Sequence, residues 1–235
     1  LEVLSAESIS EHICQQALRR ARRAKEQKVR ARDDGREKAV NLGIAANEGR
    51  LELISPAAVA TEAFDPATGK LLWTARTGGM NASSRPIYRH GHVFVFSGMG
   101  SMSAIRPGGN GDVDDTHVTW SRRKVVPKKS SPLLIGDFLF MVSDEGIASC
   151  SNPLTGEVIW AERLKIKGQC ASSPIHASGR IYSFSSAGDC IVFKAEKNGL
   201  NILAHNRLPN GCMASPAVVG DSILVRTKDS LYRFE

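Results

Sequence analysis

The sequence predicts an all-β protein, a partial or small β-propeller of about four to five four-stranded antiparallel blades with an N-terminal α-helical arm. Two repeating features of the 235 residues support this fold class. Prolines, three of them preceded by serine, recur at intervals of 46, 42 and 42 residues, at Pro86, Pro132, Pro174 and Pro216. Glycine pairs 20 residues apart recur with them, and their second members are Gly69, Gly111, Gly156 and Gly199.

Each repeat contains segments in which apolar residues alternate with a period of two, such as HVFVFS, DFLFMVS, RIYSFSS and DSILVRT. Segments rich in Val, Ile, Phe and Tyr and bounded by Gly turns are typical of strands. Four short strands in about 42 residues is the spacing of a propeller blade. Counted from Gly49, the pattern predicts 18 strands, which fits a fragment, an open partial propeller or a small ring of about five blades.

A nine-residue phrase occurs twice, as DPATGKLLW at residues 65–73 and as NPLTGEVIW at residues 152–160. The first residue of each can hydrogen-bond the turn that it begins, and the glycine can adopt the positive φ that closes it. We expect the tryptophan on the outer strand, packed against the neighbouring blade. The predicted blade-docking residues are Asp65, Gly69, Trp73, Trp120, Asn152, Gly156 and Trp160.

The first phrase resembles the repeat signature of the quinoprotein-like, PQQ-repeat β-propellers, Ala-x-Asp-x-x-Thr-Gly-x-x-x-Trp, through Ala63, Asp65, Thr68, Gly69 and Trp73. The chain from residue 47 to 235 is similar to such repeats, in particular to the non-catalytic BamB-like type found in bacteria. This resemblance implies a scaffold with a protein partner and a periplasmic or extracytoplasmic location. Quinoprotein dehydrogenases hold the quinone over a disulfide of adjacent cysteines beside a calcium ion. Because this sequence has no Cys-Cys pair, no PQQ cofactor is expected.

Residues 1–46 differ from the repeats and are predicted to form a basic helical arm or a disordered extension. Eight Lys and Arg residues stand between Gln15 and Arg32 against one acid, Glu26, and the whole chain has a formal net charge of +7. Nucleic-acid binding through this arm is a weaker alternative, because no aromatic residues are interleaved with the charges. No apolar run is long enough to span a membrane.

The position four residues before each proline is the candidate site of the repeat. If the Ser-Pro strand is the innermost of its blade, these positions lie at the mouth of the central channel, and they are Ala82, Lys128, Cys170 and Cys212. Two other groups of polar residues contain side chains that can bind metal ions, but we interpret both groups as surface features. They are an inserted loop with Asp112, Asp114, Asp115 and His117, and a turn with His90 and His92.

The sequence thus predicts no catalytic, cofactor-binding or metal-binding residues. The function that it favours is a non-catalytic scaffold or a ligand- or protein-binding module. The alternative is a fragment of a PQQ-dependent dehydrogenase whose catalytic blades lie outside this chain.

Overall fold

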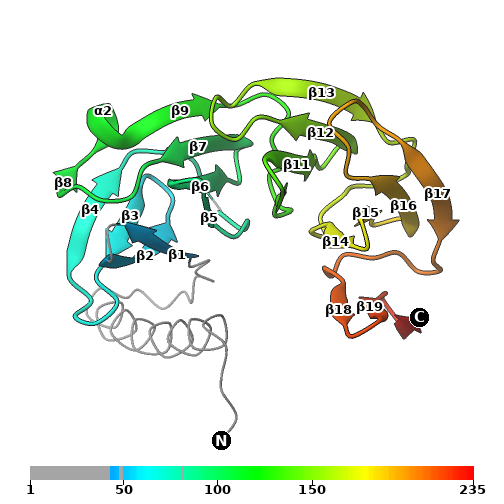
Figure 1. Cartoon of the computed structure of the whole chain (residues 1–235). Helices are drawn as coiled ribbons and strands as arrows, with labels where there is room; N and C mark the ends of the chain where they lie inside the picture. The colour runs from blue at the N-terminus through cyan, green and yellow to red at the C-terminus, as the bar shows by residue number, and fades with distance from the viewer. Residues whose placement is uncertain (1–42, 48–49, 81) are drawn as a thin grey trace, which may run out of the picture.

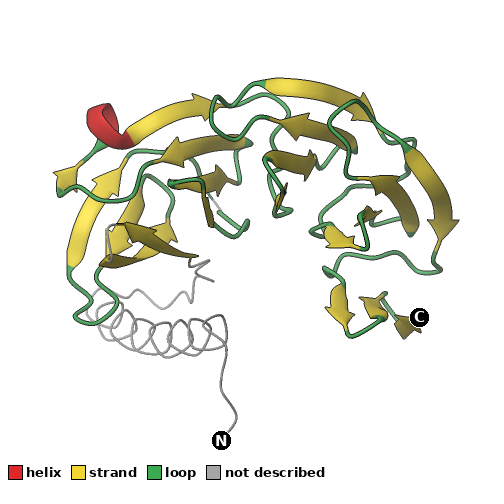
Figure 2. Ribbon diagram, in the orientation of Figure 1, coloured by secondary structure: helices red, strands yellow, loops and turns green. Residues whose placement is uncertain are grey.

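The computed structural model describes residues 43–47, 50–80 and 82–235. They form five successive β-sheets arranged around an open arc (Figure 1). The predicted all-β class and blade number are therefore confirmed, and one short helix, α2 (Asp114–His117), accompanies the strands (Figure 2). The predicted N-terminal arm falls almost entirely on residues 1–42, outside the described part of the chain. No helix in the described part is long and apolar enough to cross a membrane.

The first sheet contains β1 (Gly43–Asn47), β2 (Arg50–Pro56), β3 (Thr61–Phe64), β4 (Leu71–Ala75) and β8 (Gly111–Asp112). The second contains β5 (Ile87–Arg89), β6 (His92–Ser97), β7 (Ser101–Ile105) and β9 (Val118–Arg122). The third contains β10 (Leu133–Ile135), β11 (Phe138–Val142), β12 (Ile147–Ser151) and β13 (Val158–Arg163). The fourth contains β14 (Ile175–Ala177), β15 (Arg180–Phe184), β16 (Asp189–Lys194) and β17 (Ile202–Arg207). The fifth contains β18 (Ala217–Val219), β19 (Ser222–Arg226) and β20 (Leu231–Phe234).

Two strands were not expected from the sequence. β1 begins at Gly43, before the domain boundary placed at residue 47, and its small residues lack the Val-, Ile- and Phe-rich alternation of the other strands. β8 is formed by the inserted loop of the second repeat, which pairs in parallel with β4 of the first sheet, Trp73 opposite Gly111. The insertion therefore joins two neighbouring sheets.

The Ser-Pro positions link the innermost strands of successive sheets. The Arg85 amide donates to Ser131 Oγ at 3.0 Å, the Ser131 amide to Ser173 Oγ at 2.8 Å, and the Ser173 amide to Ser215 Oγ at 2.9 Å. Each bond joins one repeat to the next through equivalent atoms. The serine before the proline is thus an inter-sheet acceptor, which gives the 42-residue period a structural reason.

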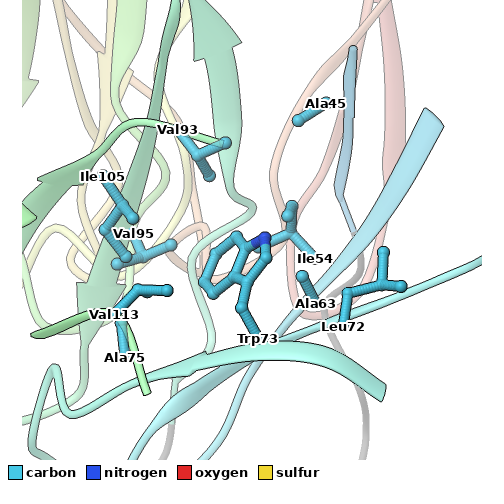
Figure 3. Packing of buried hydrophobic residues seen from close by; sticks show 10 residues of the cluster. All are labelled: Ala45, Ile54, Ala63, Leu72, Trp73, Ala75, Val93, Val95, Ile105 and Val113. Carbon is cyan, nitrogen blue, oxygen red and sulfur yellow. The ribbon is translucent and has the colours of Figure 1, made fainter. Parts of the chain in front are cut away.

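The hydrophobic cores lie between successive sheets. Trp73, Val93 and Ile105 are fully or almost fully buried in the core between the first and second sheets (Figure 3). Equivalent clusters join the second sheet to the third, the third to the fourth and the fourth to the fifth. The tryptophan-bearing strands β4, β9 and β13 run along the outer side of the arc (Figure 1).

The fifth sheet has three strands and exposes large apolar side chains on both of its faces. Its large apolar side chains Val218, Val219, Leu231 and Phe234 are between 41% and 70% exposed. In the described part of the chain no strand pairs the fifth sheet with the first. The arc is consequently open between its two ends (Figure 1).

Candidate functional site

The loops emerge at two opposite ends of the sheets. Neighbouring strands of a sheet run in opposite directions. The connections from one sheet to the next, and those from the second to the third strand of a sheet, therefore reach one end. The connections from the first to the second strand and from the third to the fourth strand reach the other end. We call the first end the basic face. Its described segments are 57–60, 76–80, 82–86, 98–100, 123–132, 143–146, 164–174, 185–188, 208–216 and 227–230.

Charge is divided unequally between the two ends. Arg76, Asp112 and Asp114 neutralise one another, since Arg76 forms ion pairs with Asp112 at 3.0 Å and Asp114 at 3.7 Å, and the counts below leave out all three. The basic face then has three acids, Asp144, Glu145 and Asp229, against eight bases: Arg85, Arg123, Lys124, Lys128, Lys129, Lys165, Lys167 and Lys228. The opposite face has three bases, Lys70, Arg106 and Lys197, against five acids: Asp65, Asp137, Glu157, Glu196 and Asp221. Within the described loops, positive charge is therefore in excess at one end and negative charge at the other.

Three exposed apolar side chains gather on the basic face where the first and second sheets meet. Val59, Met80 and Met99 are 72%, 59% and 66% exposed. The Gly78 amide donates to the Val59 carbonyl at 3.1 Å, and the Met99 amide donates to Ser97 Oγ at 3.0 Å. The first bond joins the loop of Val59 to the loop of Met80, and the second lies within the loop of Met99. We call Val59, Met80 and Met99 the apolar patch.

Gly79 fixes the position of Met80 in this patch. Its φ of 113° is one that other residues rarely adopt, and a Cβ atom there would lie 1.8 Å from Ser97 Oγ. Only glycine lets the backbone approach the turn between β6 and β7 this closely. The loop that carries Met80 is thereby held against the loop that carries Met99.

A small cavity lies beneath the apolar patch. It measures about 10 Å³, roughly the room for one water molecule, and it is lined by Pro56, Ala57, Thr77, Gly78, Val95, Phe96, Ser97, Ser101, Met102 and Ser103. Small-molecule sites usually occupy roughly 300–1,000 Å³. At about 10 Å³ this cavity is too small for a ligand of that kind, and none of its lining side chains can serve in acid–base catalysis.

Lysines border the patch on its third-sheet side. The stem of Lys128 lies beside Gly100, and Ser83 Oγ donates to the carbonyls of Lys128 at 3.3 Å and Lys129 at 3.1 Å. Lys128 Nζ pairs with Glu145 at 3.2 Å. Farther round the arc, Lys124, Lys165 and Lys167 are exposed and form no ion pair within the described residues.

The four predicted channel-mouth positions lie in unlike environments. Lys128 is exposed on the basic face and Ala82 is half-buried, whereas Cys170 and Cys212 are 1% and 0% exposed. The two thiols belong to different hydrophobic clusters, one between the third and fourth sheets and one between the fourth and fifth. Burial raises the pKa of Cys170 to about 11. This differs from the expected channel-mouth arrangement, because both side chains turn into the cores.

The predicted docking tryptophans form polar contacts through Nε1. Trp120 donates to the Pro153 carbonyl of the third sheet at 3.0 Å. Trp160 likewise donates to the Glu196 carbonyl of the fourth sheet at 3.1 Å. Trp73 instead donates to Glu52 Oε2 at 2.7 Å, and the same oxygen accepts the Gly108 amide of the second repeat at 3.2 Å. A fully buried carboxylate thus takes the place of a turn carbonyl at the first junction.

The predicted turn residues close the repeated turns. Asp65 Oδ1 accepts the amides of Ala67 at 2.7 Å and Thr68 at 3.2 Å, and Asn152 Oδ1 accepts the Leu154 amide at 2.9 Å. Gly69 and Gly156 have φ values of 69° and 73°. The hydrogen bond from Ala67 is the main cause that holds the pKa of Asp65 below its usual value.

The polar groups weighed as metal ligands serve local contacts. His92 Nε2 is 3.1 Å from Thr119 Oγ1, and His90 Nε2 is 3.6 Å from Asp137. His117 Nδ1 is 2.7 Å from Thr116 Oγ1. Within the described residues no three His, Cys, Asp or Glu side chains are grouped so that they could hold a metal ion.

The described residues do not fit a quinone site. The described cysteines, Cys150, Cys170, Cys190 and Cys212, are free, buried and never adjacent in sequence. They therefore supply no disulfide of neighbouring cysteines on which a quinone ring could stack. The described residues also contain no group of three His, Cys, Asp or Glu side chains that could hold a calcium ion beside a quinone.

Sequence reasoning missed the apolar patch and the charge division. The charge division follows from the order of strands, because the repeat assigns each loop to one end, whereas the apolar patch depends on the packing of Gly79 on Ser97. The available signal was the set of Met residues in Gly-rich loops, GGM and GMG, which stand apart from the strand pattern.

Comparison with known proteins places the chain in a family. A family model described as outer membrane protein assembly factor BamB matches residues 36–235. No curated protein matches the sequence. The solved structure of BamB from Moraxella catarrhalis is similar with a TM-score of 0.62 and 16% identity, over 84% of this chain and 62% of that chain. BBS1N in complex with ARL6DN, in a crystal soaked with lead, is similar with a TM-score of 0.58 and 13% identity, over 86% and 65%.

These structural likenesses show the fold, and the chain spans less than two thirds of the length of either protein. The family match covers most of the sequence, including every described sheet. The chain therefore belongs to the PQQ-repeat β-propeller family described as outer membrane protein assembly factor BamB.

Proposed function

We propose that this chain is a non-catalytic β-propeller scaffold that binds a protein partner through its basic face. The observation that carries the proposal is the apolar patch, in which Val59, Met80 and Met99 are 72%, 59% and 66% exposed on neighbouring loops of the basic face. Grouped exposed apolar side chains mark interaction surfaces, and methionine adapts its shape to a partner. The description of the matching family as an assembly factor supports the same role.

Site-specific photo-crosslinking in cells tests this proposal. A photoreactive phenylalanine analogue is introduced at Met80, at Met99 and, as a control, at Leu154, which is 50% exposed in a turn of the opposite face. We expect one adduct of the same mass from positions 80 and 99 and none from 154. The purified partner should then bind the wild-type chain and lose affinity for Met99→Gln. Equal adducts from all three positions, or none from 80 and 99, would contradict the proposal.

The dehydrogenase alternative makes a different prediction. PQQ and calcium are added to the purified chain, and bound-quinone absorbance and dye-linked alcohol oxidation are measured. The scaffold proposal requires both to stay at the level of a protein-free control. Stoichiometric quinone binding with turnover would overturn it.

A further inference from the structure

We infer that the partner of the basic face presents an acidic segment that also carries apolar side chains. This inference rests on the proposed function and adds the chemistry of the partner to it. The first argument is charge complementarity. Eight bases face three acids across the loops of this end, and the opposite end carries the reverse excess. Such a field attracts acidic segments and repels basic ones.

The positions of the exposed lysines and of the apolar patch determine the order in which a bound segment would make its apolar and charged contacts. Lys128 lies next to the patch, and its charge is partly used by Glu145. Lys124, Lys165 and Lys167 lie in the loops that lead to the third and fourth sheets, exposed and without ion pairs in the described chain. An apolar anchor over the patch, followed by carboxylates toward the fourth sheet, fits this arrangement.

The residues of the basic face favour a protein over nucleic acid. Single-stranded nucleic acid is bound by aromatic side chains on which bases stack, interleaved with positive charge. The described loops of the basic face contain no Phe, Tyr or Trp, and their exposed apolar residues are Val59, Met80, Met99 and Met213. These aliphatic and thioether groups pack on apolar side chains.

A second copy of the chain fits less well. Its opposite face is acidic, but within the described loops of that face Leu154 is the one large apolar side chain that is strongly exposed. Head-to-tail stacking of two copies would therefore pair opposite charges but would place the apolar patch against a largely polar surface.

Selection from a random peptide library displayed on phage tests the inference with the whole chain as bait. We expect the selected peptides to be enriched in Asp and Glu together with Leu, Ile, Phe or Met. A selected peptide should bind roughly tenfold more weakly to the double variant Lys124→Glu/Lys165→Glu, since attraction is replaced by repulsion at two sites. Higher salt should weaken the wild-type complex as well. The opposite-face variants Lys70→Glu and Leu154→Gln serve as matched controls, and both should bind the peptide as the wild type does.

Four results would overturn the inference. Two concern the selection: the selected peptides are basic, or they are acidic without apolar residues. The third is that a single-stranded RNA oligonucleotide or anionic lipid vesicles bind more tightly than the selected peptide. The fourth is that the chain self-associates with rising concentration and that the lysine double variant abolishes this self-association. Failure here is separable from failure of the proposed function. Crosslinks from Met80 and Met99 to a partner segment that is basic would retain the protein-binding role and reject the acidic partner.

Discussion

The indole ring of Trp120 lies directly against the backbone of Gly156 in the next sheet. A Cβ atom at Gly156 would be 2.7 Å from Trp120 Cδ2 and Cε3, and Trp120 Nε1 donates to the Pro153 carbonyl at 3.0 Å. The NPLTG turn is thus the contact surface for the tryptophan of the preceding repeat. Two parts of the repeated phrase meet each other across a sheet junction.

Gly156→Ala should destabilise the protein by about 3 kcal/mol. The left-handed φ of 73° costs a residue with a Cβ about 1–2 kcal/mol, and the overlap with Trp120 adds roughly 1–3 kcal/mol. Gly136→Ala is the control, because Gly136 also has a positive φ, 56°, but nothing lies within 4 Å of its Cβ position. Urea unfolding compares the two variants. Equal losses would mean that the tryptophan contact contributes nothing.

Removal of one serine from the inter-sheet series should weaken a single junction. In Ser173→Ala the amide of Ser131 loses its acceptor at 2.8 Å, and the expected loss is about 1 kcal/mol in the free energy of unfolding. Ser173→Thr keeps a hydroxyl at the same place and should retain most of the stability. If Thr and Ala variants unfold at the same urea concentration, the hydroxyl is not the stabilising group.

The buried carboxylate at the first junction should tolerate an amide but not a hydrocarbon. Glu52→Leu leaves the N–H groups of Trp73 and Gly108 without an acceptor, at about 1–3 kcal/mol each. In Glu52→Gln the amide oxygen accepts both, and the new NH₂ replaces Oε1, which has no hydrogen-bond partner. Thermal unfolding should therefore rank Gln well above Leu, and the reverse order would refute this assignment of donors.

The fold was predictable because its unit is short and repeated. The Ser-Pro spacing predicts the repeat itself, and the structure adds that the hydroxyl oxygens of Ser131, Ser173 and Ser215 each accept a hydrogen bond from the preceding repeat. β1 was missed because Gly43–Asn47 contains no large β-branched or aromatic alternation except at Ile44. β8 was missed because its two residues pair only after the insertion reaches the neighbouring sheet.

The candidate site was less predictable, because it depends on three-dimensional neighbours. Met80 and Met99 are 19 positions apart in different connections, and the packing of Gly79 on Ser97 brings their loops together. Cys170 occupies a repeat position equivalent to that of the exposed Lys128, yet it is buried. Equivalent positions of the repeat share a backbone location, but an apolar side chain there packs into the core and a charged one extends into solvent.

The pKa of Asp65 gives a test of the repeated turn. The hydrogen bond from the Ala67 amide lowers this pKa, so the carboxylate stabilises the folded state above about pH 4 and loses that contribution as pH falls through the folded value. Carboxyl-carbon NMR titration should show a midpoint below 3.8. Asp65→Asn should keep the turn at neutral pH, as Asn152 does in its own repeat. A midpoint at or above 3.8 would contradict the turn geometry.

The four described thiols should be inert in the folded protein. Burial raises the pKa of Cys150 to about 11 and that of Cys190 to about 12, so almost no thiolate forms near neutral pH. In a Cys14→Ser background, reaction with a disulfide reagent at pH 8 should be slow in buffer and fast in urea for all four. Because the unfolded thiols ionise near 9.0, the folded state should also lose stability as pH rises from there toward 11. Rapid labelling of any of the four in the native protein would show that its core is open to solvent.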